Sequence, residues 1–411
     1  MRSPPRMVPV ALFSCVFLAV FTEVLLSPFY PQFFRQVFSV EDLSYTGYYI
    51  FICRLTVVLC APLWGLLSRR WAVKWLLAIG QAGAALMTAL MATSQSIQQF
   101  ITFSVLLLLF KSSYLLVYPL IVQLAGNGQR STIAGTYQAV FHGAIIAATV
   151  AGAWMVNLEA PLFLFYWIAI ADLVQLALCL LVLRDAPTPS PASTELKAEP
   201  PASGNGLKFV AAIGLTLLTF QLANNLVRPF FTEYVTAPDN FGVSLQASSL
   251  LFLIPSVMAI AAMPYIRKVA QPGRLPLLYS VGLGLLIVSL FLQGSTAHLS
   301  VLVLSRVVYG FMLAVTQAAL ELHLFEHSSH HRLHYNYSLV TAFANVGHLG
   351  APLLASWLVN TYSLAAPLLA AGAICLINLG FARLTIFRPA ALPAVSSIPP
   401  LPISQISQKE S

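Results

Sequence analysis

Charged residues are scarce in this chain of 411 residues, because Asp, Glu, Lys and Arg together make up only 8% of it. Soluble proteins usually carry about a quarter of such residues, so the composition excludes a soluble enzyme and a nucleic-acid-binding protein. Cysteine is also rare. The five cysteines all lie within apolar runs, at Cys15, Cys53, Cys60, Cys179 and Cys375. We interpret them as small buried apolar residues and expect neither a disulfide framework nor a cysteine metal site.

Common enzyme motifs are missing as well. The chain contains no G-x-x-x-x-G-K-[ST] loop, so we do not expect ATP to drive it directly. It contains neither H-E-x-x-H nor G-x-S-x-G, which argues against a hydrolase embedded in the membrane. The sequence therefore predicts no enzymatic activity and no cofactor.

Long apolar runs dominate what is present: 58% of the residues are hydrophobic and the mean hydropathy is +0.82. A helix needs about 20 apolar residues to cross a bilayer. The first run is too long for a cleaved signal peptide, lacks an A-x-A site and contains Glu23. We predict an all-α membrane protein with twelve transmembrane helices, at about 8–33, 46–68, 74–93, 98–124, 132–156, 161–183, 208–235, 243–265, 275–293, 298–323, 335–359 and 363–385.

The positive charges predict the orientation of these helices. Cytoplasmic loops of membrane proteins are enriched in Lys and Arg. If both termini are cytoplasmic, the outer loops hold only Arg35, whereas sixteen basic residues fall on the inner side: Arg2, Arg6, Arg69, Arg70, Lys74, Arg130, Arg184, Lys197, Lys208, Arg267, Lys268, Arg274, Arg332, Arg383, Arg388 and Lys409. We therefore expect both termini in the cytoplasm, and the net charge of +8 to reflect topology.

Two polar segments divide the chain. Residues 185–206 are rich in Pro, Ser, Ala and Glu, a composition typical of a disordered linker. The segment after 386 is Pro-rich and of low complexity. We predict a six-helix bundle at 1–184, a cytoplasmic linker at 185–206, a second six-helix bundle at 207–385 and a disordered cytoplasmic tail at 386–411.

The two bundles share short matches in the same order, which indicates a duplicated unit. Pro28-Phe29 in the first run matches Pro229-Phe230 in the seventh, which also pairs Glu23 with Asn224. KSSY, which begins at Lys111, matches RVVY, which begins at Arg306. WMVN and WLVN end at Asn157 and Asn360. Parallel repeats of this kind form the two halves of one class of transporter.

With this duplication, twelve helices and a central linker, the chain resembles the major facilitator superfamily. The family's loop between the second and third helices reads roughly G-x-L-a-D-R-x-G-R-K. Here Gly65, Leu67, Arg70 and Lys74 are kept, and Arg69 stands where the family has Asp. The resemblance implies that this loop, with Gly65, Arg69, Arg70 and Lys74, takes part in the conformational change, although the acid of the usual charge latch is missing.

The first run also resembles the drug:proton antiporter branch, because Pro28-Phe29-Tyr30-Pro31 follows that branch's P-x-x-P pattern. The fifth-helix motif of that branch, G-x-x-x-G-P-x-x-G-G, retains only Gly143 and Gly152. The resemblance implies a multi-pass protein of the bacterial inner membrane. We expect a monomer whose partners are a small molecule, protons and the lipid bilayer, with no nucleic acid.

Ionisable residues inside membrane helices usually face a cavity or a partner. Lys111 and Arg306 occupy equivalent positions in the two repeats, so we expect them to face each other across the pseudo-twofold axis. The functional interpretation is a substrate anion that bridges them, with Tyr114 and Tyr309 as hydroxyl donors. The alternative is that each cation pairs with a nearby acid or carbonyl and stabilises the fold.

Further polar residues on the expected cavity helices complete the candidate site. Arg54 and Arg228 are candidate anion ligands, and Arg228 precedes Pro229, which can open the seventh helix. Glu23 is the candidate proton carrier, although a permanent pair with Arg54 is the alternative. Asn224 and Gln317 are candidate polar contacts. Asp172, on a helix that the resemblance places at the periphery, is interpreted as structural.

The segment between the tenth and eleventh runs is rich in histidine. It carries His323, His327, His330, His331 and His334, together with two glutamates. Metal binding or pH sensing is conceivable for such a segment. We interpret residues 323–334 as a solvated cytoplasmic loop and predict no metal site.

Four buried cations against two acids predict a positive cavity. We therefore expect a secondary transporter that works by alternating access and exports a small organic anion, such as a carboxylate metabolite or siderophore, coupled to protons. The alternatives are proton-coupled uptake of an organic anion or siderophore, and multidrug:proton antiport. A membrane-embedded enzyme or sensor is the remaining class, but the chain offers neither a nucleophile motif nor an added soluble domain.

Overall fold

The computed structural model describes residues 7–68, 70–117, 120–121, 130–182, 204–271, 273–327 and 333–387. Almost all of these residues are helical, and no strand occurs among them. The first half contains α1 (Met7–Val24), η1 (Ser27–Phe29), α2 (Tyr30–Phe38), α3 (Ser44–Leu67), α4 (Val73–Met91), α5 (Ile97–Lys111), η2 (Ser112–Leu116), α7 (Arg130–Met155), η4 (Pro161–Phe163) and α8 (Leu164–Val182).

The second half repeats this pattern after the segment that joins the two. It contains α9 (Gly204–Leu226), α10 (Phe231–Thr236), α11 (Leu245–Val269), α12 (Leu275–Ser295), α13 (Leu299–Glu326), α14 (Leu333–Thr361) and α15 (Ala366–Thr385). Eleven stretches in the described residues are long and apolar enough to cross a membrane, and Val140–Met155 of α7 is a shorter apolar helix. These segments follow the twelve predicted runs, and the predicted all-α fold is confirmed.

The outer surface of the helices is apolar. Leu181, Ile377 and Leu384 have 71%, 71% and 73% of their surface exposed, and many other large apolar side chains are also exposed. A soluble protein rarely exposes apolar patches of this extent. Lipid is the medium that such a surface requires, so the protein is a multi-pass membrane protein.

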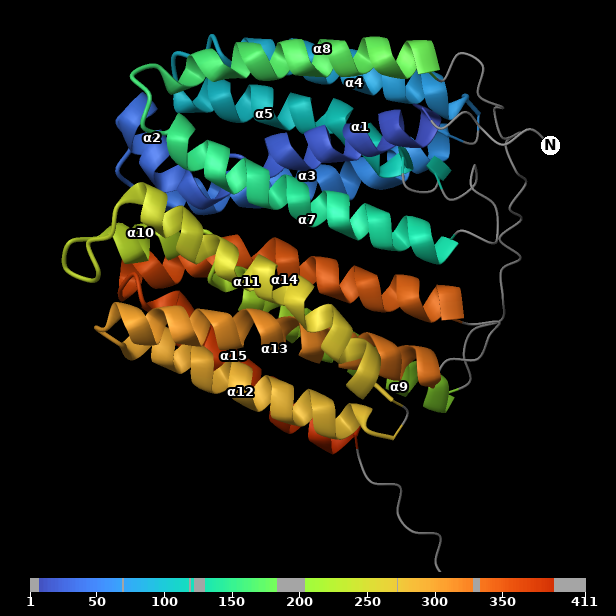
Figure 1. Cartoon of the computed structure of the whole chain (residues 1–411), viewed down its shortest axis with the longest axis vertical. Coiled ribbons are helices and arrows are strands. Elements are labelled where there is room, and N and C mark those ends of the chain that lie inside the picture. Colours follow the sequence, from blue (N-terminus) through green and yellow to red (C-terminus); the bar gives the residue numbers. More distant parts are fainter. Residues whose placement is uncertain are drawn as a thin grey trace, which may run out of the picture.

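Each half has its own apolar core. In the first half, Phe33, Phe34 and Phe100 are almost fully buried and form a cluster of aromatic rings between α2, α3 and α5. In the second half, a larger cluster joins α9, α12, α13, α14 and α15. Figure 1 shows the halves as two layers, with α1–α8 in one and α9–α15 in the other. Two separately packed bodies can change their relative tilt without unfolding.

Both halves begin with a helix that proline interrupts. A proline within a helix removes a backbone hydrogen bond and clashes with the preceding turn. The first run breaks after α1 at Ser27–Phe29, where Pro28 lies, and continues as α2. The seventh run ends α9 at Leu226 and resumes as α10 at Phe231, with Pro229 between them. The predicted opening of the seventh helix is therefore present, and the first helix has an equivalent break.

Candidate functional site

A central cavity of about 470 Å³ lies between the two halves. Broken helices at equivalent positions of a repeat are the usual frame of a transporter binding site, and the cavity adjoins both breaks. Its lining combines apolar and aromatic side chains with ionisable ones. The ionisable lining residues are Glu23, Arg54, Lys111, His142, Arg228, Arg306 and His348.

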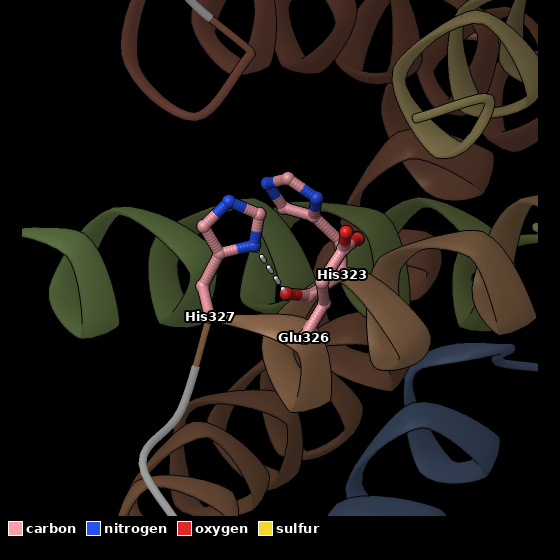
Figure 2. Close-up of side chains that lie close together, drawn as sticks. All are labelled: His323, Glu326 and His327. Atoms are coloured by element: carbon pink, nitrogen blue, oxygen red, sulfur yellow. Dashed lines mark hydrogen bonds between the residues drawn. The ribbon is translucent and has the colours of Figure 1, made fainter. Parts of the chain in front are cut away.

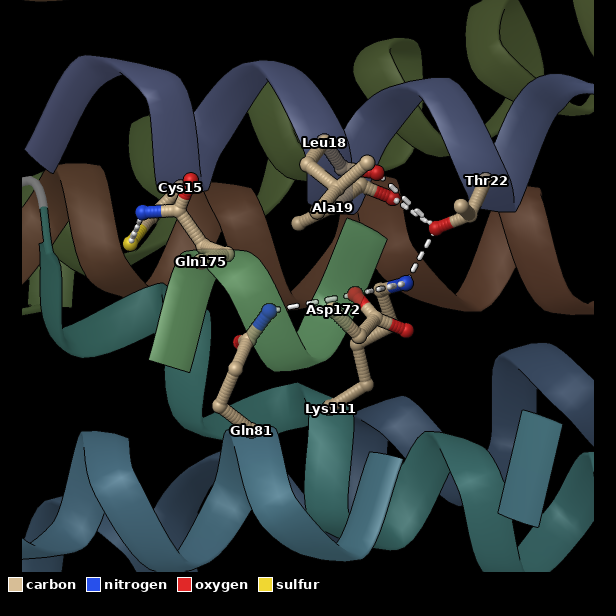
Figure 3. Close-up of polar contacts among 8 residues, drawn as sticks. All are labelled: Cys15, Leu18, Ala19, Thr22, Gln81, Lys111, Asp172 and Gln175. Carbon is tan, nitrogen blue, oxygen red and sulfur yellow. Dashed lines mark hydrogen bonds and ion pairs between the residues drawn. The ribbon is translucent and has the colours of Figure 1, made fainter. Parts of the chain in front are cut away.

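Lys111 is at the C-terminal end of α5 and is 5% exposed. Its Nζ donates to the Thr22 hydroxyl and lies 3.8 Å from Oδ1 of Asp172, which is fully buried on α8. Figure 3 shows this group, with Gln81 donating to the same Asp172 oxygen at 3.1 Å. The lysine is therefore held by an acid of its own half. This arrangement matches the alternative in which the cation stabilises the fold.

Arg306 lies on α13 and is 3% exposed. Its guanidinium stacks on the ring of Phe231, 3.8 Å from the ring centroid, and donates to Oε1 of Gln293 at 3.3 Å. Cation–π contact stabilises a desolvated arginine without neutralising its charge. Within the described residues, no carboxylate lies within 4 Å of this guanidinium.

Arg54 on α3 and Arg228 at the α9–α10 break come from opposite halves, yet their charges interact. Arg228 also interacts electrostatically with Arg306. Among the described residues, neither Arg54 nor Arg228 has an acid within ion-pair distance. Arg54, Arg228 and Arg306 all line the central cavity, and this set of three is called the arginine row. His142 and His348 line the same cavity.

Glu23 is the one acid that lines the cavity within the described residues. It lies on α1 just before the first helix break and is exposed to the chamber. Its carboxylate interacts electrostatically with Arg54 and Lys111, but neither cation is within 4 Å of it in the described part of the chain. Tyr114 donates to Oε2 of Glu23 at 3.5 Å. A permanent Glu23–Arg54 ion pair is therefore not what the structure contains.

Three of the predicted ligands do not line the central cavity. Tyr114 donates to Glu23 at 3.5 Å, and Asn224 is buried on α9, where its Oδ1 accepts a hydrogen bond of 3.0 Å from Tyr309. Gln317 borders a smaller cavity of about 170 Å³ inside the second half and donates to Glu321 at 3.0 Å. These positions follow from the helix faces, which point into the bundle of one half. Tyr309 does line the central cavity.

The loop between α3 and α4 is only partly described. Gly65 lies in the last turns of α3, Arg70 is exposed, and Lys74 is in the first turn of α4. Arg69 lies outside the described residues. The role of these four residues in the conformational change remains a prediction.

Sequence reasoning missed the contacts that join the two halves. In the described residues, the four hydrogen bonds between the halves all lie at one end, on the left in Figure 1, where α2 meets α10. Arg35 donates to Oε1 of Glu233 at 2.7 Å, and Gln32 donates to Oε2 at 2.8 Å. Gln32 and Glu233 are 201 residues apart, as are Pro28 and Pro229. The repeat offset could therefore have pointed to this contact.

We expect Glu233→Gln to shift the conformational equilibrium toward a form that is open at this end. The change in the conformational equilibrium should be small, at most about fivefold, because an ion pair at the protein surface contributes about 0–1 kcal/mol. Spin labels on the α2–α3 and α10–α11 connections, placed in a cysteine-free background, would report the change as a longer distance distribution. Glu41→Gln removes an exposed acid at the same end and should leave the distances unchanged. An identical distribution in both variants would show that Glu233 does not hold the halves together.

Two helical halves around a shared polar chamber, within an apolar outer surface, define a membrane transporter. A family model for the Major Facilitator Superfamily matches residues 12–266 and 213–405. Since these matches cover well over half of the sequence, the chain belongs to the major facilitator superfamily. It is a secondary transporter of small molecules and not an enzyme, as the sequence predicts.

Relatives and solved structures agree with this assignment. The multidrug resistance protein MdtG of Klebsiella pneumoniae (strain 342) is 22% identical over 376 residues, which cover 89% of this chain and 90% of that protein. The inward-facing, occupied structure of a bacterial homologue of the human lysosomal transporter Spinster matches with a TM-score of 0.74 and 12% identity, over 96% of this chain and 100% of that one. The human organic anion transporter MFSD10 matches with a TM-score of 0.65 and 19% identity, over 92% and 100%.

Proposed function

We propose that this protein exports a small organic anion across the bacterial inner membrane, coupled to protons and with both termini in the cytoplasm. The observation that supports the anion is the row of Arg54, Arg228 and Arg306. Positive charge in a low-dielectric chamber is costly unless an opposite charge compensates it. Within the described residues no carboxylate pairs with these arginines, so a visiting anion is the natural counter-charge.

This site differs from the one that the repeats suggest. A substrate carboxylate bridging Lys111 and Arg306 would have to compete with Asp172 for the lysine. Arginine binds carboxylates through two parallel hydrogen bonds, and the three arginines come from both halves. An anion held between Arg54 of the first half and Arg228 or Arg306 of the second would contact both moving bodies. That arrangement lets binding influence their relative tilt.

The direction of transport follows from two further considerations. All four hydrogen bonds between the halves lie at the α2–α10 end, which is the outer end if the termini are cytoplasmic. The chamber then loads from the inside. The membrane potential, negative inside, favours anion exit by about 2.3 kcal/mol per charge per 100 mV. The inward-open chamber is compatible with export, and the membrane potential supports it.

The test is flux of anionic and cationic probes in proteoliposomes. We expect Arg228→Gln and Arg306→Gln each to lower the rate for a di- or tricarboxylate by at least about tenfold, because losing one charge-assisted hydrogen bond costs ~1.5–3 kcal/mol. Arg274→Gln, which removes an exposed arginine ahead of α12, is the matched control. Normal carboxylate flux in both cavity variants would exclude the arginine row as the substrate site.

Multidrug:proton antiport is the second candidate. The relative from Klebsiella pneumoniae is named a multidrug resistance protein, and aromatic rings line the cavity beside the charges, including Phe100, Phe141, Phe165, Phe231 and Phe252. Such a surface suits amphipathic compounds. This candidate predicts that lipophilic cations move through the wild-type protein and that Arg228→Gln speeds them, since it removes a repelling charge. Anion export predicts that such cations are not transported.

A further inference from the structure

The last turn of α13 contains a cluster that the sequence analysis placed in a solvated loop. That interpretation is wrong for His323, because α13 continues to Glu326 and the His323 side chain is only 5% exposed. The sequence of this turn is His323-Leu324-Phe325-Glu326-His327. Residues three and four apart lie on one face of a helix. His323, Glu326 and His327 therefore share a face.

The side chains of these three residues converge. One ligand atom of each lies within 4.8 Å of the others, and the two imidazole ring centroids are 4.1 Å apart. Figure 2 shows the two rings side by side above the end of the helix. His327 and Glu326 are exposed, so they can rotate toward a common centre while His323 stays fixed.

Two hydrogen-bonding features make this cluster unusual. Within the described residues, no hydrogen bond of regular geometry reaches either ring nitrogen of the buried His323, although the backbone of Ile386 interacts with this ring. A buried polar group with such weak partners is costly. Its ring is enclosed by Phe387 at 4.7 Å and Phe209 at 6.0 Å between centroids. In His327, Nδ1 lies 3.0 Å from the carbonyl oxygen of His323. A carbonyl only accepts, so Nδ1 carries the proton and Nε2 keeps its lone pair.

We propose that His323, Glu326 and His327 bind one divalent transition metal ion of the zinc class. Two imidazoles and one carboxylate are a donor set that Zn²⁺ accepts at about 2.0–2.2 Å, with a fourth position left for another ligand. Imidazole donors exclude Mg²⁺ and Ca²⁺, which take oxygen ligands. The Nδ1 bond to a backbone carbonyl is the second contact that metal-bound histidines normally make. A metal would also give the His323 ring a strong partner, which no regular hydrogen bond provides within the described residues.

The position of the cluster suggests what such a metal does. α13 carries Arg306, and its last turn packs against Phe209 of α9 and Phe387 beyond α15. A metal held by three side chains of this turn stabilises the helix end and keeps α13 seated on both neighbours. Such a metal would act on the packing of the second half and not on the substrate directly, because none of its ligands lines the central cavity.

The test uses the purified full-length protein and Zn²⁺ alone. His330 and His331 lie outside the described residues, and His334 lies in the first turn of α14. All three could bind metal themselves, so the reference variant replaces them with alanine. We expect this reference to bind one Zn²⁺ per chain in competition with a chromogenic chelator. Adding His327→Ala or Glu326→Gln should weaken binding by at least about tenfold. Both residues are exposed, so neither change endangers folding.

His298→Ala, which removes an exposed histidine just ahead of α13, should leave the affinity unchanged. Co²⁺ provides a second readout, because a site with two imidazoles and one carboxylate gives the intense visible absorption of tetrahedral cobalt. That absorption should disappear in the His327→Ala variant. The proposal is overturned if the reference variant binds no Zn²⁺, or if His327→Ala and Glu326→Gln bind it as tightly as the reference.

Discussion

Replacing Lys111 with methionine while Asp172 stays in place is expected to lower the free energy of unfolding by about 3–5 kcal/mol. The reason is the burial of the pair. Asp172 is fully buried and Lys111 is 5% exposed. The substitution therefore leaves a carboxylate in an apolar bundle, with Gln81 as a neutral hydrogen-bond donor. One oxygen of Asp172, Oδ2, already has no hydrogen-bond partner among the described residues. The lysine is therefore the main compensation for that charge.

Asp172→Asn should be damaging for the reciprocal reason, because it removes the carboxylate that lies 3.8 Å from the ammonium of Lys111 and leaves the Thr22 hydroxyl as its hydrogen-bond partner within the described residues. The double variant Lys111→Met/Asp172→Asn removes both charges together. Replacing a whole buried ion pair by neutral groups is often close to neutral in stability. We expect the double variant to recover most of the loss, which gives a large coupling energy in a double-mutant cycle.

Stability can be followed by titrating the detergent-purified protein with SDS and recording tryptophan fluorescence. Lys208→Met, at an exposed position on α9, is the matched control and should change the unfolding midpoint little. If the two single variants are as stable as the wild type, the pair does not hold the first half together. If the double variant loses more stability than the two single variants combined, the coupling has the wrong sign.

The same three variants separate the two interpretations of Lys111. A lysine that binds substrate is required even in a stable protein, so the double variant would fold and fail to transport. A lysine that serves the fold can be lost with its partner, so the double variant would fold and transport. We expect the second result, because Asp172 and Thr22 already contact the ammonium group of Lys111 on α5. The proposed anion site is formed by other residues, those of the arginine row.

The sequence predicts the fold well because the bilayer restricts the choices. Apolar runs of about 20 residues can only be helices or strands of a closed barrel, and the matching Pro-Phe pairs at 28 and 229 reveal the duplication. Pro28 and Pro229 also predict where helices break, because the loss of a backbone donor is a local property. The end of α13 is harder to predict. His323 and Glu326 are polar, yet tertiary contacts with Phe209 and Phe387 keep the last turn helical and half of it buried.

The site is less predictable because partners depend on helix rotation. The repeat equates Lys111 with Arg306, but it does not say that Asp172 of α8 turns toward Lys111 while Arg306 meets Phe231. Charge inside the membrane pointed to helices that line the cavity. It could not separate a cation that has an acid in its own bundle from one that lacks it. That distinction depends on how each helix is rotated in the packed bundle, which the sequence does not give. Because Lys111 has an acid partner, the candidate anion site is the arginine row and not Lys111.

Replacing Glu23 has the second large expected effect, because under the proposed function its surroundings would set how protons and substrate are coupled. It is the acid of the chamber in the described residues and interacts with Arg54 and Lys111. Protonating Glu23 makes the chamber more positive, which favours anion binding. By itself this effect moves the proton and the anion across the membrane in the same direction, as in uptake by symport. Export against entering protons requires something more. Glu23 must bias the conformational equilibrium, and its place beside the break between α1 and α2 suits that role.

We expect Glu23→Gln to abolish the dependence of transport on the pH gradient while anion exchange continues. Glutamine imitates the protonated acid and cannot release a proton, so the pH gradient can no longer drive transport through this position. Gradient-driven flux in proteoliposomes should fall to the level of empty liposomes. Binding of the anion should tighten by about 5–150-fold, the range that coupling free energies of 1–3 kcal/mol produce. Counterflow with labelled anion on one side measures exchange separately.

Two comparisons make this result specific to the chamber. Glu23→Asp keeps an ionisable group and should retain gradient-driven flux, whereas Glu159→Gln removes an exposed acid outside the chamber and should behave as the wild type. Anion binding and anion exchange, both measured in the Glu23→Gln variant, then indicate the direction of coupling. If Glu23→Gln binds the anion more tightly but exchanges it slowly, the acid acts on the conformational step, as export requires. If gradient-driven flux is unchanged in Glu23→Gln, another group carries the proton, and the chamber acid serves only to balance Arg54 and Lys111.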